Sequence, residues 1–206
     1  MIPGRGVRVS LWFAFQTCQS PPGAYNRGMT QDRFAFDKLL YKGRVAELHS
    51  VGVRMADGRV VQRDFVHYNG ATLVLPVLAD GSIVMIRNRR FAVNEDLLEL
   101  PAGMLDGPEA PESAARRELT EETGYTAGRI EPLGPFYTGP GSTDENMYVF
   151  LATELQAGPQ HLEAYEEIRV LIYPQAEVRR MILDGTIHDG KTIAALAMYW
   201  LRQAAI

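Results

Sequence analysis

The residues best suited to chemistry are three closely spaced glutamates, Glu118, Glu121 and Glu122. In a helix, positions i, i+3 and i+4 project from one face, so these three carboxylates would lie together. Their mutual repulsion weakens a bare helix, but a hard divalent cation such as Mg²⁺ prefers oxygen ligands and would make the cluster favourable. The alternative interpretation is a solvated acidic helix face, so the neighbouring residues must decide.

Two neighbours of the cluster favour a metal site. Arg117 precedes Glu118 and can reach back to Glu109 or Glu121, where it would fix the orientation of a carboxylate. Gly103 permits a tight loop whose backbone oxygens can approach a metal ion. The helix, the arginine and the glycine loop together indicate a cation held by oxygen atoms.

The spacing from Gly103 to Tyr125 is a glycine, five residues, Glu109, seven residues, Arg-Glu-Leu, one residue, two glutamates, one residue, Gly124 and a bulky residue. This pattern resembles the Nudix box, and the similarity to the Nudix hydrolase family extends roughly from Leu40 to the C-terminus. The resemblance implies an α/β fold, the Nudix α/β/α sandwich. It also implies metal-dependent hydrolysis of a nucleoside diphosphate linked to another group.

The resemblance assigns roles by position. Glu118 and Glu122 would be the main Mg²⁺ ligands, with Mn²⁺ as a possible substitute. Glu121 would be a further ligand or would support them, and the carbonyl of Ala102 would complete the site. The supporting residues would be Arg117, which orients the glutamates, Glu109, which braces the loop, and Gly103 and Gly124, which are structural.

Two segments outside the box resemble ADP-ribose and sugar-nucleotide pyrophosphatases. The segment 137–145 is similar to their S-P-G-x-(S/T)-x-E loop, and 98–103 is similar to the strand that enters their box. A plain Pro-Gly turn is the alternative for the loop. The substrate-binding candidates from these segments are Glu99, Gly103, Pro140 and Glu145.

The chain departs from those enzymes at two places. Their Gln-x-Arg before the box is Asn88-Arg89-Arg90 here, which leaves Arg90 for phosphate or ribose. Their N-terminal aromatic is replaced by Arg44, so Phe65, Tyr68 or Arg44 itself would stack on the base.

The segment 187–192 resembles the I-x-D-G-K-T sequence of GDP-mannose hydrolases, although Asp189 or Thr192 could simply cap a helix. We therefore expect hydrolysis of ADP-ribose to AMP and ribose 5-phosphate, with GDP-mannose or another nucleoside-diphosphate sugar as the alternative. A non-catalytic ADP-ribose-sensing Nudix module is a third hypothesis. The complete set of box glutamates disfavours it.

The resemblance places the general base outside the box, on the loop 158–167, where Glu163 and Glu166 are candidates. The position that often holds the family's glutamate is Ala164 here. Glu166 is slightly preferred over Glu163, and the alternative is that both are only solvated. Glu121 would then be the next candidate.

The expected elements alternate strands with few helices, which implies a mixed sheet covered by helices. An N-terminal β-hairpin turns at Ala56-Asp57-Gly58 and would expose a strand edge in a monomer. The protein is therefore expected to be a homodimer whose subunits associate through the strands of residues 37–70. The strands are expected at 44–54, 59–68, 71–78, 82–88, 97–100, 130–138, 147–153 and 168–173, and the helices at 111–123, 175–183 and 191–204.

Composition excludes several classes of protein. The 206 residues carry a net charge of −4, which gives no bulk attraction for nucleic acid or anionic membrane. No apolar run reaches the ~20 residues of a membrane span. The single cysteine excludes an internal disulfide and fits a reducing compartment, so a cytoplasmic location is expected. The partner is expected to be a small-molecule nucleotide.

The N-terminal segment is expected to lie outside the Nudix domain, which we place at residues 37–206. Residues 1–36 are interpreted as a disordered leader, or as sequence upstream of a true start at Met29. The apolar run 9–15 after two arginines weakly resembles a signal peptide, but no clear cleavage site follows it.

Overall fold

The structure is a computed structural model that describes residues 34–164 and 166–205. The expected leader lies outside the described residues up to position 33. Strand β1 (Phe34–Lys42) begins before the boundary expected at residue 37. The sequence analysis did not predict this strand, because it is largely exposed and lacks the apolar–polar alternation of a half-buried strand.

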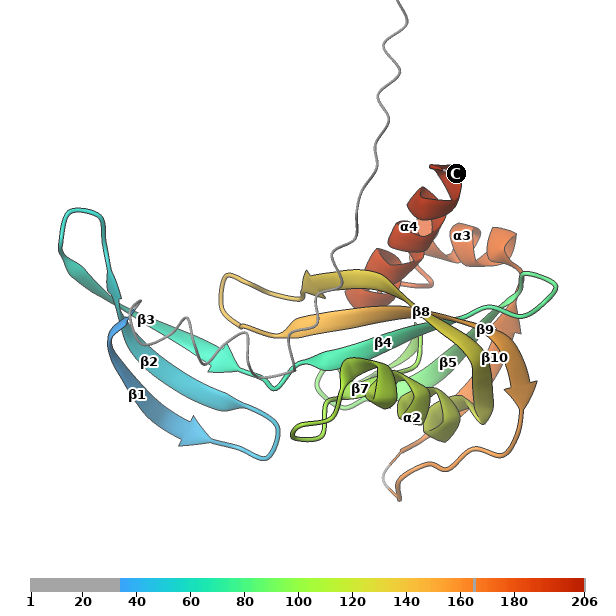
Figure 1. Cartoon of the computed structure of the whole chain (residues 1–206), viewed down its shortest axis with the longest axis horizontal. Coiled ribbons are helices and arrows are strands. Elements are labelled where there is room, and N and C mark those ends of the chain that lie inside the picture. Colours follow the sequence, from blue (N-terminus) through green and yellow to red (C-terminus); the bar gives the residue numbers. More distant parts are fainter. Residues whose placement is uncertain (1–33, 165, 206) are drawn as a thin grey trace, which may run out of the picture.

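The N-terminal strands form a separate antiparallel sheet in the order β1-β2-β3. Strands β2 (Glu47–Arg54) and β3 (Val60–His67) are joined by the expected hairpin turn, where Gly58 has a φ of 85°. The expected two-stranded hairpin is thus the inner part of a three-stranded sheet. This sheet projects to one side of the body of the molecule (Figure 1).

Seven further strands form two sheets in the body. The orders are β7-β4-β9-β8 and β10-β5-β6, and β4 and β9 are parallel whereas the other pairs are antiparallel. The strands are β4 (Ala71–Pro76), β5 (Ile83–Arg90), β6 (Glu95–Glu99), β7 (Ala102–Met104), β8 (Tyr125–Tyr137), β9 (Asn146–Ala157) and β10 (Ile168–Tyr173). The short β7 was not expected, and β8 begins five residues earlier than the start expected at 130.

Helices cover opposite faces of this body. Helix α2 (Pro111–Thr123) packs through Ala115 and Leu119 on Val74, Phe150 and Ala152. Helices α3 (Gln175–Leu183) and α4 (Gly190–Ala204) cover the larger core on the other face. The α/β/α sandwich with a mixed sheet is therefore confirmed. None of the described helices combines the length and apolar character that a bilayer span requires.

The segment between β6 and β7 is held from both sides. Thr192, in the first turn of α4, is fully buried and its Oγ1 accepts a hydrogen bond from the Leu100 amide at 2.9 Å. The Ala102 amide donates to the Glu122 carboxylate of α2 at 2.8 Å. Because β7 also pairs with the fully buried β4, the backbone around Ala102 is fixed in place.

Candidate active site

Helix α2 presents the box glutamates. Pro111 occupies its first turn, and Gly124 ends it in the left-handed region with a φ of 74°, as the sequence predicted. Glu118 and Glu122 lie on the buried face with only 8% and 3% of their surface exposed. Glu121 is half-buried at the edge of this face. The three carboxylates thus lie on one side of α2, as their spacing predicted.

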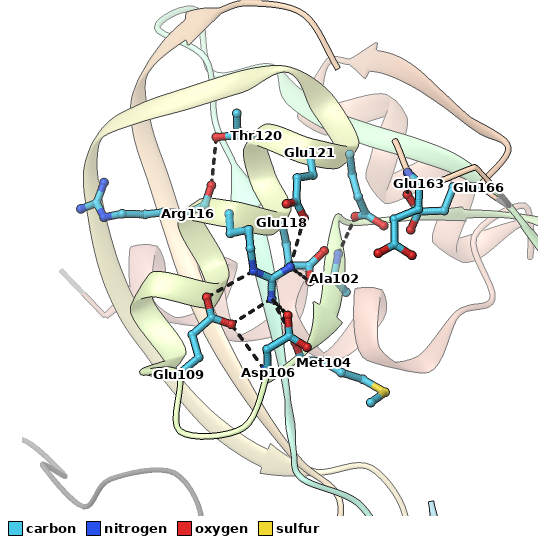
Figure 2. A network of polar contacts seen from close by, with 12 residues as sticks. Ala102, Met104, Asp106, Glu109, Arg116, Glu118, Thr120, Glu121, Glu163 and Glu166 are labelled. Atoms are coloured by element: carbon cyan, nitrogen blue, oxygen red, sulfur yellow. Dashed lines mark hydrogen bonds and ion pairs between the residues drawn. The ribbon is translucent and has the colours of Figure 1, made fainter. Parts of the chain in front are cut away.

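Arg117 connects the members of the box. Its Nη1 donates to Glu118 at 2.6 Å and to Glu121 at 3.0 Å, and its Nε and Nη2 donate to Glu109 at 3.2 and 2.9 Å. Nη2 also donates to the carbonyl of Met104 at 3.2 Å. Figure 2 shows this fan of contacts around one guanidinium. Arg117 therefore orients two of the candidate ligands and ties the helix to the loop that Glu109 occupies.

Gly103 and Ala102 bring backbone against the carboxylates. A Cβ atom on Gly103 would overlap the carboxylate of Glu118, so any other residue here would displace that carboxylate. The Ala102 amide already bonds Glu122 on the neighbouring turn of α2. The carbonyl of Ala102, the candidate backbone ligand, belongs to the same short strand.

The two inner glutamates lie in an environment that disfavours their charge. Burial raises the pKa of Glu118 to about 7, against the opposing effect of Arg117. Burial raises the pKa of Glu122 to about 8, although the Ala102 amide opposes the shift. A cation beside these two buried carboxylates would favour their ionised form at neutral pH.

The donor set fits a hard divalent cation, because it consists of carboxylate and backbone oxygens without sulfur. Among the described residues, no three His, Cys, Asp or Glu side chains already stand in metal-ligand geometry. Glu118 and Glu121 instead share Arg117 Nη1. Each of these two carboxylates keeps one oxygen outside its hydrogen bond with Nη1, Oε2 in Glu118 and Oε1 in Glu121.

A cavity of about 390 Å³ lies beside the glycine loop. Gly103 and Ala102 form one part of its lining, and Arg90 forms another. The remaining lining residues are Ala71, Met104, Thr138, Glu145, Met147, Asp189 and Lys191. The cavity therefore joins the box loop to the first turn of α4.

Glu99 differs from its predicted role as a substrate contact. Its side chain is fully buried, so it has no surface for a ligand. Arg90 donates to both of its carboxylate oxygens, at 2.8 and 2.6 Å, and Lys191 Nζ lies 2.5 Å from Oε2. Glu99 therefore holds two cations that line the cavity. The sequence analysis did not assign Lys191 a role, although the Asp-Gly-Lys-Thr motif contained it.

The loop 138–145 reaches the cavity through its two ends. Thr138 Oγ1 donates to the Glu145 carboxylate at 2.5 Å, and both residues line the cavity. Pro140, also predicted to contact substrate, lies on the loop but is absent from the lining. The Tyr68 amide donates to Asp144 at 3.0 Å, which fixes the loop to the end of β3.

The candidates for base stacking do not reach this cavity. Arg44 and Phe65 belong to the N-terminal sheet region, and neither lines the cavity of its own chain. The Phe65 ring instead stacks on His49, with 5.3 Å between ring centroids. For either residue to stack on the nucleobase of a substrate in this cavity, it would have to come from a second copy of the chain.

Glu163 and Glu166 face the box from the loop before β10 (Figure 2). The Glu166 carboxylate accepts from the Glu163 amide at 2.9 Å. Of the two, Glu166 is the half-buried one, and its negative charge contributes to the raised pKa values of both Glu118 and Glu122. These observations favour Glu166 as the carboxylate closer to the box.

The loop that carries Glu163 and Glu166 is anchored to the end of α2. Gln160 Nε2 donates to the carbonyl of Glu122 at 2.6 Å, and the His161 amide donates to that of Glu121 at 2.9 Å. The sequence analysis missed Gln160, because a polar loop residue carries no signal of a distant partner.

Known proteins match both the sequence and the fold. Residues 67–196 match the NUDIX domain. This chain belongs to the Nudix family. It is 34% identical to the ADP-ribose pyrophosphatase of Bacillus subtilis (strain 168), over 80% of this chain and 90% of that protein. It is also 34% identical to a GDP-mannose pyrophosphatase of Shigella flexneri serotype 5b (strain 8401), over 82% of this chain and 95% of that protein.

A solved structure agrees on the fold of this Nudix protein. The crystal structure of an ADP compounds hydrolase superposes with a TM-score of 0.70 at 21% identity, covering 83% of this chain and 94% of that one. The family and the fold predicted from the box are thus confirmed, and so is the enzyme class, a Nudix pyrophosphatase.

The raised carboxyl pKa values predict how the stability of the metal-free protein depends on pH. Glu118 and Glu122 titrate near 4.5 when unfolded but at about 7 and about 8 when folded, so the folded state binds more protons between these values. The free energy of unfolding should therefore fall as pH rises from 5.5 to 8.5, by on the order of 5 kcal/mol. Denaturant unfolding in EDTA at a series of pH values measures this.

The Glu122→Gln variant is the control for this experiment. It should flatten the pH profile, and the difference from wild type removes the contribution of His67, whose pKa is raised by Asp144 and acts in the same direction. Mg²⁺ should stabilise the wild type more at pH 8.5 than at pH 5.5. Identical profiles for wild type and Glu122→Gln would contradict the assigned titration.

Proposed function

We propose that this Nudix protein hydrolyses the diphosphate bond of ADP-ribose to AMP and ribose 5-phosphate, with Mg²⁺ as its cation and Mn²⁺ as a possible substitute. The observation that carries the proposal is the pair of buried carboxylates, Glu118 and Glu122, beside a cavity lined by Arg90 and Lys191. The similarity to ADP-ribose pyrophosphatases over most of both chains supports the choice of substrate.

The residues divide the chemical work. Glu118 and Glu122 would hold the cation, with Glu121 and the Ala102 carbonyl as further oxygen donors. When bound, the cation supplies neutralisation of phosphate charge and acidification of water. Arg117 orients the carboxylates of Glu118 and Glu121 through its Nη1. The protein then acts by positioning and electrostatics, without a covalent nucleophile.

Glu166 is proposed as the general base, which accepts the proton of the attacking water. Its half-buried carboxylate lies near the box and is held by the Glu163 amide. Glu163 itself is exposed, which supports a secondary role. A base on a loop tied to α2 by Gln160 would keep its distance to the metal ligands.

GDP-mannose remains the second candidate substrate. Lys191, from the segment that resembles GDP-mannose hydrolases, lines the cavity, and curated GDP-mannose pyrophosphatases are similar over 95% of their length. Asp189 of the same segment caps α4 by accepting from the Thr192 amide at 3.0 Å, so the motif also has a structural use. The complete set of box glutamates argues against a purely sensing module.

We also propose a cytoplasmic homodimer formed through the N-terminal sheet. Strand β1 exposes apolar side chains, among them Phe36, Leu39, Leu40 and Tyr41, which are 46–67% exposed. An exposed apolar patch of this kind marks an association surface. In a dimer, Arg44 and Phe65 could reach the partner's cavity. The single cysteine supports a reducing compartment.

Loss of a metal ligand tests the proposed reaction. Glu118→Gln and Glu122→Gln should each lower the turnover of ADP-ribose by at least ~100-fold, because each removes a charged oxygen ligand. Glu112→Gln, on the same helix but exposed and paired with Arg116, is the matched control and should be near wild type.

The substrates are ADP-ribose, GDP-mannose, UDP-glucose and diadenosine compounds, with products identified by mass. ADP-ribose should give the highest kcat/KM, and GDP-mannose in first place would favour the second candidate. Near-normal activity of both Gln variants would exclude the metal assignment.

The general base is tested by kcat against pH for Glu163→Gln, Glu166→Gln and the double variant. In Glu166→Gln, kcat should fall by at least ~100-fold and the acidic limb of its pH profile should disappear, because the proton acceptor is gone. Glu163→Gln should retain both. If the double variant keeps the wild-type kcat and limb, neither residue is the base, and Glu121 becomes the next candidate.

The dimer is tested by light scattering at micromolar concentration. Leu40→Glu should shift the protein towards monomer and lower activity, because a charge would be buried in an apolar interface. Leu183→Glu is the control, since Leu183 is 88% exposed at the end of α3 on the body. A fully active wild-type monomer would contradict the proposal.

A further inference from the structure

Three charged side chains, those of Arg90, Asp189 and Lys191, line one wall of the cavity, and the buried Glu99 lies behind them. Arg90 comes from β5, Glu99 from β6, and Asp189 and Lys191 from the start of α4. Lys191 Nζ lies 2.5 Å from Glu99 and 2.9 Å from Asp189, and Arg90 holds both oxygens of Glu99. Two positive and two negative charges leave this wall with no net charge.

The wall nevertheless keeps directed hydrogen-bond donors. Lys191 donates a hydrogen bond to Glu99 and forms an ion pair with Asp189, and Arg90 uses Nε and Nη2 on Glu99. Arg90 Nη1 has no hydrogen-bond partner among the described residues. The side chains of Arg90 and Lys191 are 37% and 18% exposed, so their remaining donors can meet a ligand.

A neutral wall with fixed donors suits uncharged oxygen better than phosphate. Phosphate gains most from an unbalanced positive charge, whereas here each cation is already balanced by a buried or nearly buried carboxylate. Sugar hydroxyls both donate and accept, and the cavity supplies acceptors in Glu145 and Asp189 as well as the donors.

We propose that this wall binds the hydroxyls of the sugar that lies beyond the diphosphate bridge, and that Glu99 is the positioning residue that aims Arg90 and Lys191 at them. The proposal rests on the proposed function, because it concerns one half of that substrate. The diphosphate would lie towards Gly103 and the box, and the sugar towards α4.

The positioning is rigid because the wall is tied to the box. Leu100 is held by Thr192 and Ala102 by Glu122, so the segment from Glu99 to Ala102 spans the distance between α4 and α2. The sugar wall and the metal ligands are therefore set at a fixed separation by four residues of backbone.

Equilibrium binding separates the sugar from the phosphates. Calorimetry in EDTA compares ADP-ribose with ADP, which has the diphosphate but no second sugar. Wild type should bind ADP-ribose at least ~10-fold more tightly, and Lys191→Met should remove that preference while leaving the Kd of ADP within about twofold. Arg89→Met is the matched control, since Arg89 is exposed and pairs with Asp96 and Asn94.

Glu99→Gln should affect the affinities for ADP and ADP-ribose differently. It leaves the wall with a net positive charge, so ADP should bind as tightly as before or more tightly, whereas ADP-ribose should bind more weakly. A parallel loss of both ligands in Lys191→Met, or no preference in wild type, would overturn the sugar wall. If Glu99→Gln does not fold, as far-UV circular dichroism would reveal, Lys191→Met alone decides.

This experiment is independent of turnover. A preference for ADP-ribose without hydrolysis of any nucleotide would contradict the proposed function and keep the sugar wall. Hydrolysis of ADP-ribose with no such preference would keep the proposed function and exclude the wall.

Discussion

The burial of two like-charged carboxylates on one helix face is the constraint on which the rest of the site depends. Glu118 and Glu122 are one turn apart on α2, and burial raises the pKa of both. A protein stable enough to fold must offset this cost, since an unpaired buried charge is expensive. Arg117 offsets part of it for Glu118, and the Ala102 amide part of it for Glu122.

Several features of the fold follow from this constraint. The Glu118 carboxylate occupies the space that a side chain at position 103 would fill, and Gly103 leaves that space open. Gly124 ends α2 beside the backbone of Gly158, which brings the loop with Glu166 back over the helix end. Glu109 precedes the helix in sequence, and Arg117 holds it beside the box through two hydrogen bonds. The cluster therefore holds more negative charge than Arg117 balances, and a cation would stabilise it.

The opposite wall of the cavity solves a different electrostatic problem. Glu99 is fully buried yet has two cationic partners, so its charge is balanced where it lies. The box holds more carboxylates than its single arginine, Arg117, can balance, whereas the charges of the α4 wall are balanced, so the two sides of the cavity differ in net charge. The backbone segment from Glu99 to Ala102 joins the two sides. The strand order β10-β5-β6 matters here because it places β5, with Arg90, beside β6, with Glu99.

The sequence by itself determined the helix 111–123, the common face of its glutamates and the family, because helical periodicity and the box spacing are local properties. It also indicated the hairpin at Gly58 and the strand 168–173. Only the tertiary structure decided the role of Glu99, since its partners Arg90 and Lys191 come from different elements. It likewise decided that Phe65 lies away from its own cavity, because the N-terminal sheet stands apart from the body. Burial and charge pairing arise between segments distant in the chain, and no local pattern encodes them.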